Sequence, residues 1–301
     1  MPRRWPLRLP LTNTGSAALA APANKPTPSG SGRSNLQLRL MTAAVLIGAV
    51  IAALYLATAP VWAILTLIVT LLAAWEWSSL AHGAGQPLNH PQRAIFTLGV
   101  GAISVGLASL SLNPLWLFLP AALFWWLIAP IWLSRGWAST SARLLPLGLL
   151  LLPSFWLALV NLRAIHPNLI LAIIGAIAIA DSAAYFTGRK FGKHKLAPAI
   201  SPGKTLEGAL GAAVGVTLYG LALYPWWPLC GINCLPRGLG FFWLLLILSI
   251  VGDLFESWIK RQAGVKDSGT ILPGHGGVLD RLDSLISTLP VAALLWHWFT
   301  R

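Results

Sequence analysis

Long apolar runs separated by short polar segments dominate this chain of 301 residues. Several runs approach the roughly 20 residues that a helix needs to cross the hydrocarbon core of a bilayer. The pattern predicts an all-α, polytopic integral membrane protein with about nine transmembrane helices, and eight is the alternative count. The predicted spans are 38–57, 61–81, 94–111, 115–134, 144–162, 168–187, 208–226, 239–258 and 283–299.

The first 36 residues differ from the rest in composition. They are rich in Pro, Ser, Ala, Gly and Asn, carry several arginines, and lack an apolar run long enough for a signal peptide. We expect a disordered, basic tail at 1–36. A set of transmembrane helices at 37–165 follows, and then a catalytic transmembrane region at 166–301 with polar loops at 188–207 and 259–282.

Composition and charge agree with a membrane protein. The chain is 56% hydrophobic and only 10% charged, whereas soluble domains average about 25% charged residues. A net charge of +13 raises the question of nucleic acid binding, but the arrangement of the cations answers it. With the N-terminus in the cytoplasm and nine spans, every Lys and Arg except Arg163, Arg237 and Arg301 lies on the cytoplasmic side. The distribution of Lys and Arg therefore predicts the topology of the protein in the membrane. It predicts the membrane as a partner and no binding of nucleic acid.

Two cysteines, Cys230 and Cys234, fall together in a loop on the opposite side of the predicted membrane. In a bacterial periplasm they could form a disulfide, and two free thiols are the equally weighted alternative. A zinc site is disfavoured, because no histidine accompanies them.

Most of the acidic residues lie in one short stretch. Residues 249–284 hold five of the eight, and three predicted helices each present a polar stripe at their cytoplasmic ends. Single ion pairs that steady helix ends are the alternative, but such pairs contribute little stability. We expect carboxylates to converge on Mg²⁺ and the phosphates of a nucleotide or pyrophosphate. The converging set is Asp181, Asp253, Glu256, Asp267, Asp280 and Asp283.

Two polar loops add candidate phosphate ligands. Residues 274–277 read GHGG, so backbone N–H groups at Gly276 and Gly277 could approach a phosphate closely, and His275 could donate to it. Residues 201–205 read SPGKT, which resembles part of a P-loop but lacks the earlier glycine and the preceding strand. A basic loop that covers a nucleotide, with Lys204 on a phosphate, is the preferred interpretation.

Glu76 stands apart from these residues, near the cytoplasmic end of the second predicted span and between two tryptophans. An interfacial glutamate flanked by tryptophan anchors is the favoured interpretation. A structural role or a lipid site is the alternative.

These residues also resemble a known family. Ser257, Ile259-Lys260-Arg261, Lys266-Asp267, Leu272-Pro273, His275-Gly276-Gly277 and Asp280-Arg281-Leu282-Asp283 look like the signature of the phosphatidate cytidylyltransferases. The residues around Asp181 and the segment Ser201–Gly208 resemble further blocks of that family. The resemblance is close over 177–290, with Gly203 standing where a lysine is more usual.

The resemblance implies an integral membrane enzyme that condenses CTP with phosphatidate and releases pyrophosphate. It implies a Mg²⁺ requirement, leaves a second metal ion open, and implies a homodimer. We expect a multi-pass protein of the bacterial cytoplasmic (inner) membrane with its active site facing the cytoplasm. The catalytic candidates are Asp253, Asp280, Lys260, Arg261, Lys266, Asp267, His275 and Arg281; the nucleotide and phosphate candidates are Ser201, Lys204, Thr205, Gly276, Gly277 and Asp181; the metal candidates are Asp253, Asp280, Asp283 and Asp267.

Two other functions stay open at this point. A CTP-dependent lipid kinase of the polyprenol or dolichol type would release CDP instead of pyrophosphate. A transporter would place ionisable groups near the middle of the membrane and make them reachable from both sides, whereas here they gather on one side. The block expected of a CDP-alcohol phosphotransferase is absent from the sequence.

Overall fold

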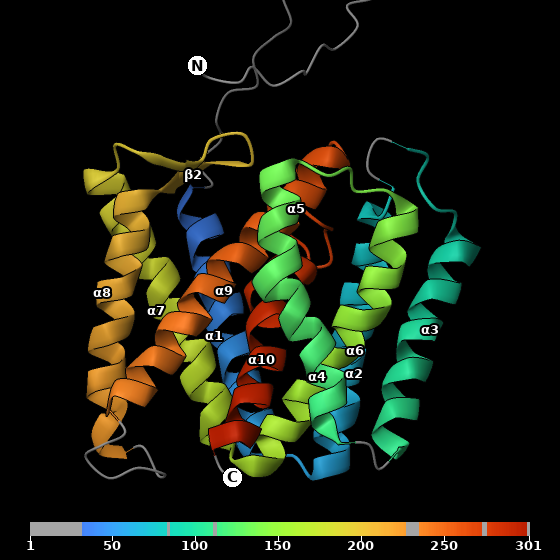
Figure 1. Ribbon diagram of the computed structural model, residues 1–301, viewed down its shortest axis with the longest axis horizontal. Coiled ribbons are helices and arrows are strands. Elements are labelled where there is room, and N and C mark those ends of the chain that lie inside the picture. The colour runs from blue at the N-terminus through green and yellow to red at the C-terminus, as the bar shows by residue number, and fades with distance from the viewer. Residues whose placement is uncertain (1–31, 83–84, 111–112, 227–234, 273–275, 300–301) are drawn as a thin grey trace, which may run out of the picture. The chain divides into compact units, whose positions relative to one another are not determined.

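The computed structural model describes residues 32–82, 85–110, 113–226, 235–272 and 276–299, and they are almost wholly helical (Figure 1). The chain divides into two units, up to Ala43 and from Ala44 onward, and the features below belong to the second unit. The helices are α1 Gly32–Leu56, α2 Ala59–Leu80, α3 His90–Ser109, α4 Pro114–Leu123, α5 Ala129–Arg135, α6 Ser141–Ile165, α7 Pro167–Phe191, α8 Leu206–Leu223, α9 Leu235–Gln262 and α10 Leu279–Phe299.

The predicted all-α membrane class is confirmed. Each predicted span overlaps a helix, and the fourth combines α4 and α5 through a π-helical turn at Phe124–Ile128. Seven of the described helices are long and apolar enough to cross a membrane, namely α2, α3, the combined helix, α6, α7, α8 and α9. The other two predicted spans, in α1 and α10, therefore remain predictions. α1 begins inside the segment predicted as a tail.

Local sequence signals explain where several helices begin and end. Asn89 and Gln92 form a capping box at the start of α3, in which each side chain accepts a hydrogen bond from the other residue's N–H. Gly136 ends α5 with a φ of 64°, which glycine adopts without strain. Thr205 caps α8 by accepting a hydrogen bond from the N–H of Gly208 at 3.1 Å.

A short hairpin interrupts the helices where the sequence predicts a basic loop. β1, Lys195–Ala197, pairs antiparallel with β2, Ser201–Thr205, and the hairpin lies over the ends of α7 and α8 (Figure 1). Strands this short carry too little alternation of polar and apolar positions to be recognised in the sequence. The hairpin places Lys204 above the helices.

α9 is held by aromatic packing. It crosses obliquely from α8 toward α5 (Figure 1). The buried ring of Phe255 meets the edges or faces of Phe124, Trp125 and Trp132 at centroid distances of 5.3, 5.5 and 5.6 Å. Such rings bury large apolar areas in fixed orientations. The next residue, Glu256, therefore faces a defined direction at the polar end of the helix.

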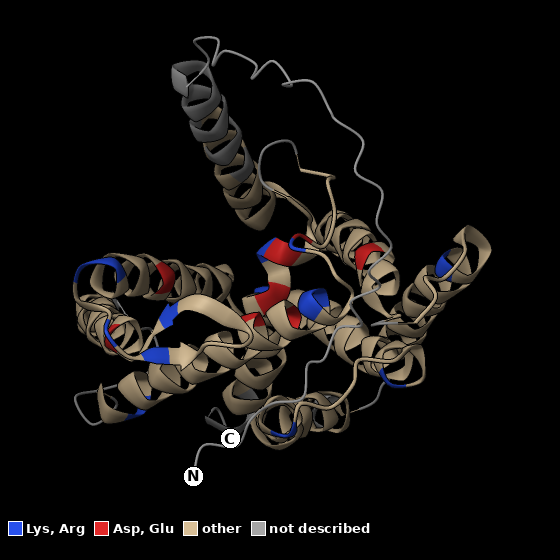
Figure 2. Ribbon diagram, turned by 90° about the horizontal axis from the view of Figure 1, so that it is seen from above, with Lys and Arg blue, Asp and Glu red and all other residues tan. Residues whose placement is uncertain are grey.

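α9 also approaches α10 closely. A side chain at Gly252 would clash with the side chain of Ser287 and lie 2.8 Å from the carbonyl of Asp283. Only glycine permits this approach. Seen from the end that carries the hairpin, several acidic residues lie near the centre of the arrangement of helices, together with some of the Lys and Arg residues, while other Lys and Arg residues lie toward its edge (Figure 2).

Candidate active site

A cavity of about 590 Å³ lies between the hairpin, α7, α8 and α9. More of its wall is apolar than polar, and small residues of α7 and α8 supply much of the apolar part. Arg189 and Lys195 are among the charged residues of the lining. Five residues predicted from the sequence line it: Asp181, Ser201, Lys204, Thr205 and Asp253. The structure thus brings together candidates that lie up to 72 positions apart in the chain.

The charges in this cavity centre on Lys204. Its ammonium group forms an ion pair with Asp253, and both groups act electrostatically on Asp181. Asp253 also accepts a hydrogen bond from Ser257 at 3.3 Å. Lys204, Asp181 and Asp253 therefore form one charged group in the cavity. Lys204 is the part of the hairpin that reaches them.

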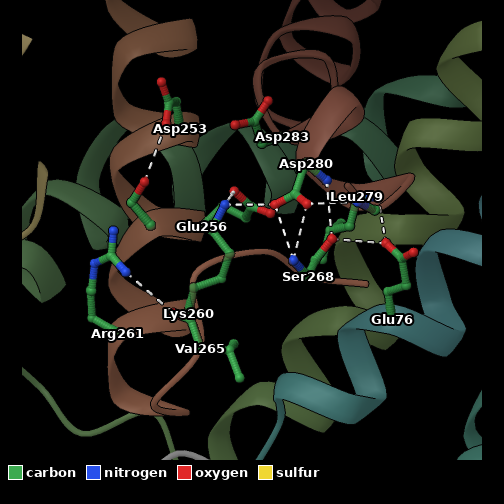
Figure 3. A network of polar contacts seen from close by, with 12 residues as sticks. Glu76, Asp253, Glu256, Lys260, Arg261, Val265, Ser268, Leu279, Asp280 and Asp283 are labelled. Atoms are coloured by element: carbon green, nitrogen blue, oxygen red, sulfur yellow. Dashed lines mark hydrogen bonds and ion pairs between the residues drawn. The ribbon is translucent and has the colours of Figure 1, made fainter. Parts of the chain in front are cut away.

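A second polar group adjoins the cavity on the same face of α9 (Figure 3). Lys260 contacts Glu256 at 2.6 Å and Asp280 at 2.7 Å. The carboxylate of Asp280 also accepts hydrogen bonds from the backbone N–H groups of Ser268, at 3.0 Å, and Gly277, at 2.8 Å. These donors fix Asp280 at the first turn of α10.

Glu76 belongs to this second group, although α2 is remote from it in the sequence. Its side chain is buried, not interfacial, so the favoured sequence interpretation is wrong. The carboxylate accepts hydrogen bonds from the hydroxyl of Ser268 at 2.9 Å and from the N–H groups of Val278 and Leu279 at 3.1 and 2.8 Å. One signal in the sequence could have found it, because an ionisable residue inside an apolar span is rare and usually functional.

Asp283 lies between the two groups. It is within electrostatic range of Asp253 in the cavity and of Glu256 beside Lys260, and Figure 3 shows it beside Asp253. The six carboxylates do not form one cluster as the sequence suggested. Over the residues described, no three Asp, Glu, His or Cys side chains come close enough to hold a metal ion alone.

The other predicted residues lie outside the cavity lining. Arg261 is exposed and donates to the carbonyl of Val265 at 3.3 Å, while Lys266, Asp267 and Arg281 are exposed. The N–H of Gly277 donates to Asp280, and the hydroxyl of Thr205 caps α8, so both groups are engaged within the chain. Three predicted features fall outside the described residues: His275, the cysteine pair Cys230 and Cys234, and most of the tail.

Gly277 has no room for a side chain, and this gives a prediction about stability. A β-carbon there would clash with Ser268 and lie 2.5 Å from a carboxylate oxygen of Glu76. We expect Gly277→Ala to lower the free energy of unfolding by about 2 kcal/mol, as overpacking does. Thermal unfolding in detergent measures the change. Gly106→Ala is the matched control, since nothing lies within 4 Å of that position, and equal midpoints for both variants would contradict the packing argument.

Comparison with known proteins identifies relatives along most of the chain. A model of the Cytidylyltransferase family matches residues 37–299. A phosphatidate cytidylyltransferase of Pseudomonas aeruginosa is 40% identical over 269 residues, which cover 87% of this chain and 97% of that protein. Another, from Haemophilus influenzae, is 32% identical over 286 residues, which cover 85% and 96%. An uncharacterized protein of Escherichia coli is 44% identical over 124 residues, 41% of this chain and 40% of that one.

Proposed function

Because the chain belongs to the cytidylyltransferase family, which its own residues already predicted, we propose that it is a phosphatidate cytidylyltransferase. The reaction joins CTP and phosphatidate into CDP-diacylglycerol and releases pyrophosphate. The observation that carries the proposal is the cavity, which combines the charged group of Asp181, Asp253 and Lys204 with a lining that is more apolar than polar. The phosphates of the lipid and of the nucleotide need charged groups, and the acyl chains of the lipid need an apolar surface.

The chemistry asks for alignment more than for proton transfer. The phosphate of phosphatidate is an anion at neutral pH, so it can attack the α-phosphorus of CTP without a strong base. The oxygen–phosphorus bond to pyrophosphate breaks as the new bond forms. The barrier comes mainly from repulsion between two anions, and Lys204 and Lys260 are placed to offset it. The acyl chains stay among the helices, and only the headgroup reaches the charged group of the cavity.

A magnesium ion fits the carboxylates at this site. Mg²⁺ usually binds one or two carboxylates together with substrate phosphates and water, so a protein cage of three acids is not needed. Asp253 and Asp283 lie close together and would hold it. Asp280 fits less well, because Lys260, Ser268 and Gly277 already occupy its oxygens. When bound, the ion would reduce the repulsion between the two phosphates.

Position and assembly belong to the same proposal. The Lys and Arg distribution supports an inner-membrane protein whose active site faces the cytoplasm, where CTP is available. The family resemblance supports a homodimer. Both are open to direct measurement, by labelling of engineered cysteines in intact cells and by mass measurement in detergent.

An assay of the purified protein tests the function. The protein in detergent is mixed with CTP, phosphatidate and Mg²⁺, and pyrophosphate and the lipid product are followed together. We expect both to appear in equal amounts and to depend on phosphatidate. Release of CDP with a polyprenol acceptor would identify a lipid kinase instead, and the absence of any CTP-dependent product would overturn the proposal.

Lys204 gives the first prediction about the substrate site. We expect Lys204→Ala to raise the KM for CTP about tenfold, because a charge-assisted contact contributes about 1.5 kcal/mol. Steady-state kinetics with CTP as the varied substrate measures it. Lys193→Ala is the matched control, since Lys193 precedes the same hairpin and does not line the cavity. An unchanged KM in Lys204→Ala would remove the hairpin from the nucleotide site.

A further inference from the structure

We infer that Glu76 is a positioning residue of the active site: from the amino-terminal half of the chain, it holds Ser268, Val278 and the start of α10 so that Asp280 faces Lys260. The inference rests on the proposed function, since the positioning matters for that reaction. It extends the functional site to α2, which carries no motif of the family resemblance.

The carboxylate of Glu76 caps α10 from outside the helix. The first N–H groups of a helix have no partner within it and carry partial positive charge. Glu76 accepts from two of the N–H groups at this end, those of Val278 and Leu279. An acid that caps a helix normally lies next to it in sequence, whereas Glu76 comes from a helix about 200 positions away. The contact therefore fixes α10 relative to α2, and it also gives hydrogen-bond partners to the N–H groups at the start of α10.

Ser268 connects Glu76 to Asp280. Its hydroxyl donates to Glu76 at 2.9 Å, and its backbone N–H donates to Asp280 at 3.0 Å. The N–H of Asp280 in turn donates to the hydroxyl of Ser268 at 3.3 Å. A single buried serine thus touches both carboxylates, so a displacement of Glu76 is transmitted to Asp280 through one residue.

The space around Glu76 is built for a carboxylate. A side chain at Gly269 or Gly277 would collide with it, so both glycines let the loop close around the acid. Among the described residues no ion pair includes Glu76. Its charge is balanced by backbone N–H groups and a hydroxyl, which leaves Lys260 for Asp280. An ion pair between Glu76 and a lysine would stabilise the fold without orienting the backbone. Hydrogen bonds from the backbone N–H groups to Glu76 orient the backbone directly.

Glu76→Gln tests the inference by replacing one carboxylate oxygen with an NH₂ group. The amide keeps one acceptor oxygen but points an NH₂ group at donors of the loop, so the loop must shift. Misplacement of a reacting group by about 1 Å costs up to about 10²-fold in rate, and we expect kcat to fall about 30-fold. The KM for CTP should stay within about threefold, because the cavity under the hairpin is untouched.

Three further measurements separate positioning from simple loss of stability. Hydrogen exchange at the amides of 277–280 should quicken in Glu76→Gln under native conditions, and this readout needs no activity. Adding Ser268→Ala to Glu76→Gln should cost little more, because both changes break the same connection. Asn89→Ala is the control: it removes the cap of α3 and should leave kcat within about twofold.

Each outcome decides the inference. A folded Glu76→Gln protein with wild-type kcat and wild-type exchange would overturn it, and so would fully additive effects of the two substitutions. A fall in kcat equal to that of Asn89→Ala would also overturn it, since any lost cap would then suffice. If the wild-type protein makes no CDP-diacylglycerol, the proposed function fails, and the exchange measurement still decides whether Glu76 holds the loop.

Discussion

Asp253→Asn is expected to lower kcat about a thousandfold while the protein stays folded. A thousandfold loss corresponds to about 4 kcal/mol of transition-state stabilisation, which is the scale of a metal-bound phosphate contact. Asp253 lines the cavity, pairs with Lys204 and interacts electrostatically with Asp283 of α10. Its side chain is about one-third exposed, so loss of the ion pair should move the unfolding midpoint little.

Comparison with Lys204→Ala shows which role of Asp253 matters. If Asp253 only holds Lys204 in place, the two single variants and the double variant should lose similar activity. If Asp253 binds Mg²⁺, Asp253→Asn should lose far more and should need a higher Mg²⁺ concentration for half-maximal rate. Glu207→Gln makes the same chemical change beside the hairpin, outside the cavity lining, and should keep its rate within about twofold. Near wild-type turnover in Asp253→Asn would contradict the proposed site.

Asp280→Asn is expected to lose both activity and stability. Its carboxylate accepts from Lys260 and from two backbone N–H groups, and its side chain is only 8% exposed. The amide would turn an NH₂ group toward these donors and leave Lys260 with Glu256 alone. Removing one partner of a buried pair costs about 3 kcal/mol, and we expect kcat to fall about 300-fold because the start of α10 shifts.

Thermal unfolding and turnover, measured on the same preparation, separate these effects. Asp280→Asn should lower the unfolding midpoint clearly, whereas Asp253→Asn should not. Adding Lys260→Met to Asp280→Asn should lower the unfolding midpoint further, because it takes the ion-pair partner from the buried Glu256. A stable Asp280→Asn protein would show that the network around Lys260 contributes less than its contacts indicate.

Much of the active site could be predicted from the sequence. Asp253, Glu256 and Lys260 share a helical face by spacing alone, and the structure places them on one side of α9 as predicted. Lys204 was expected to reach phosphates from a basic loop, and it enters the cavity beside Asp253. The shared face of α9 follows from spacing within one helix, and the basic loop is a local feature too, but the contact of Lys204 with Asp253 depends on the fold.

Other parts could not be predicted, because they depend on contacts between distant segments. Thr205 and Gly277 looked like phosphate ligands, yet the hydroxyl of Thr205 caps α8 and the N–H of Gly277 serves Asp280. Polar groups near a helix end are satisfied by whichever partner the fold brings, and sequence spacing does not name it. The division of the carboxylates into two adjoining groups follows from the close approach of α9 and α10 at Gly252.

From the sequence alone the protein could be predicted to be a set of membrane helices whose chemistry lies within 166–301, and its motifs pointed to the family that it resembles. Those conclusions follow from run lengths, composition and motifs, which are local properties. The folded arrangement was needed to find Glu76 in contact with Ser268 and the start of α10, and to place the hairpin at the wall of the cavity. The reason is physical: a buried carboxylate must find hydrogen-bond donors, and here the folded chain supplies them from about 200 residues away.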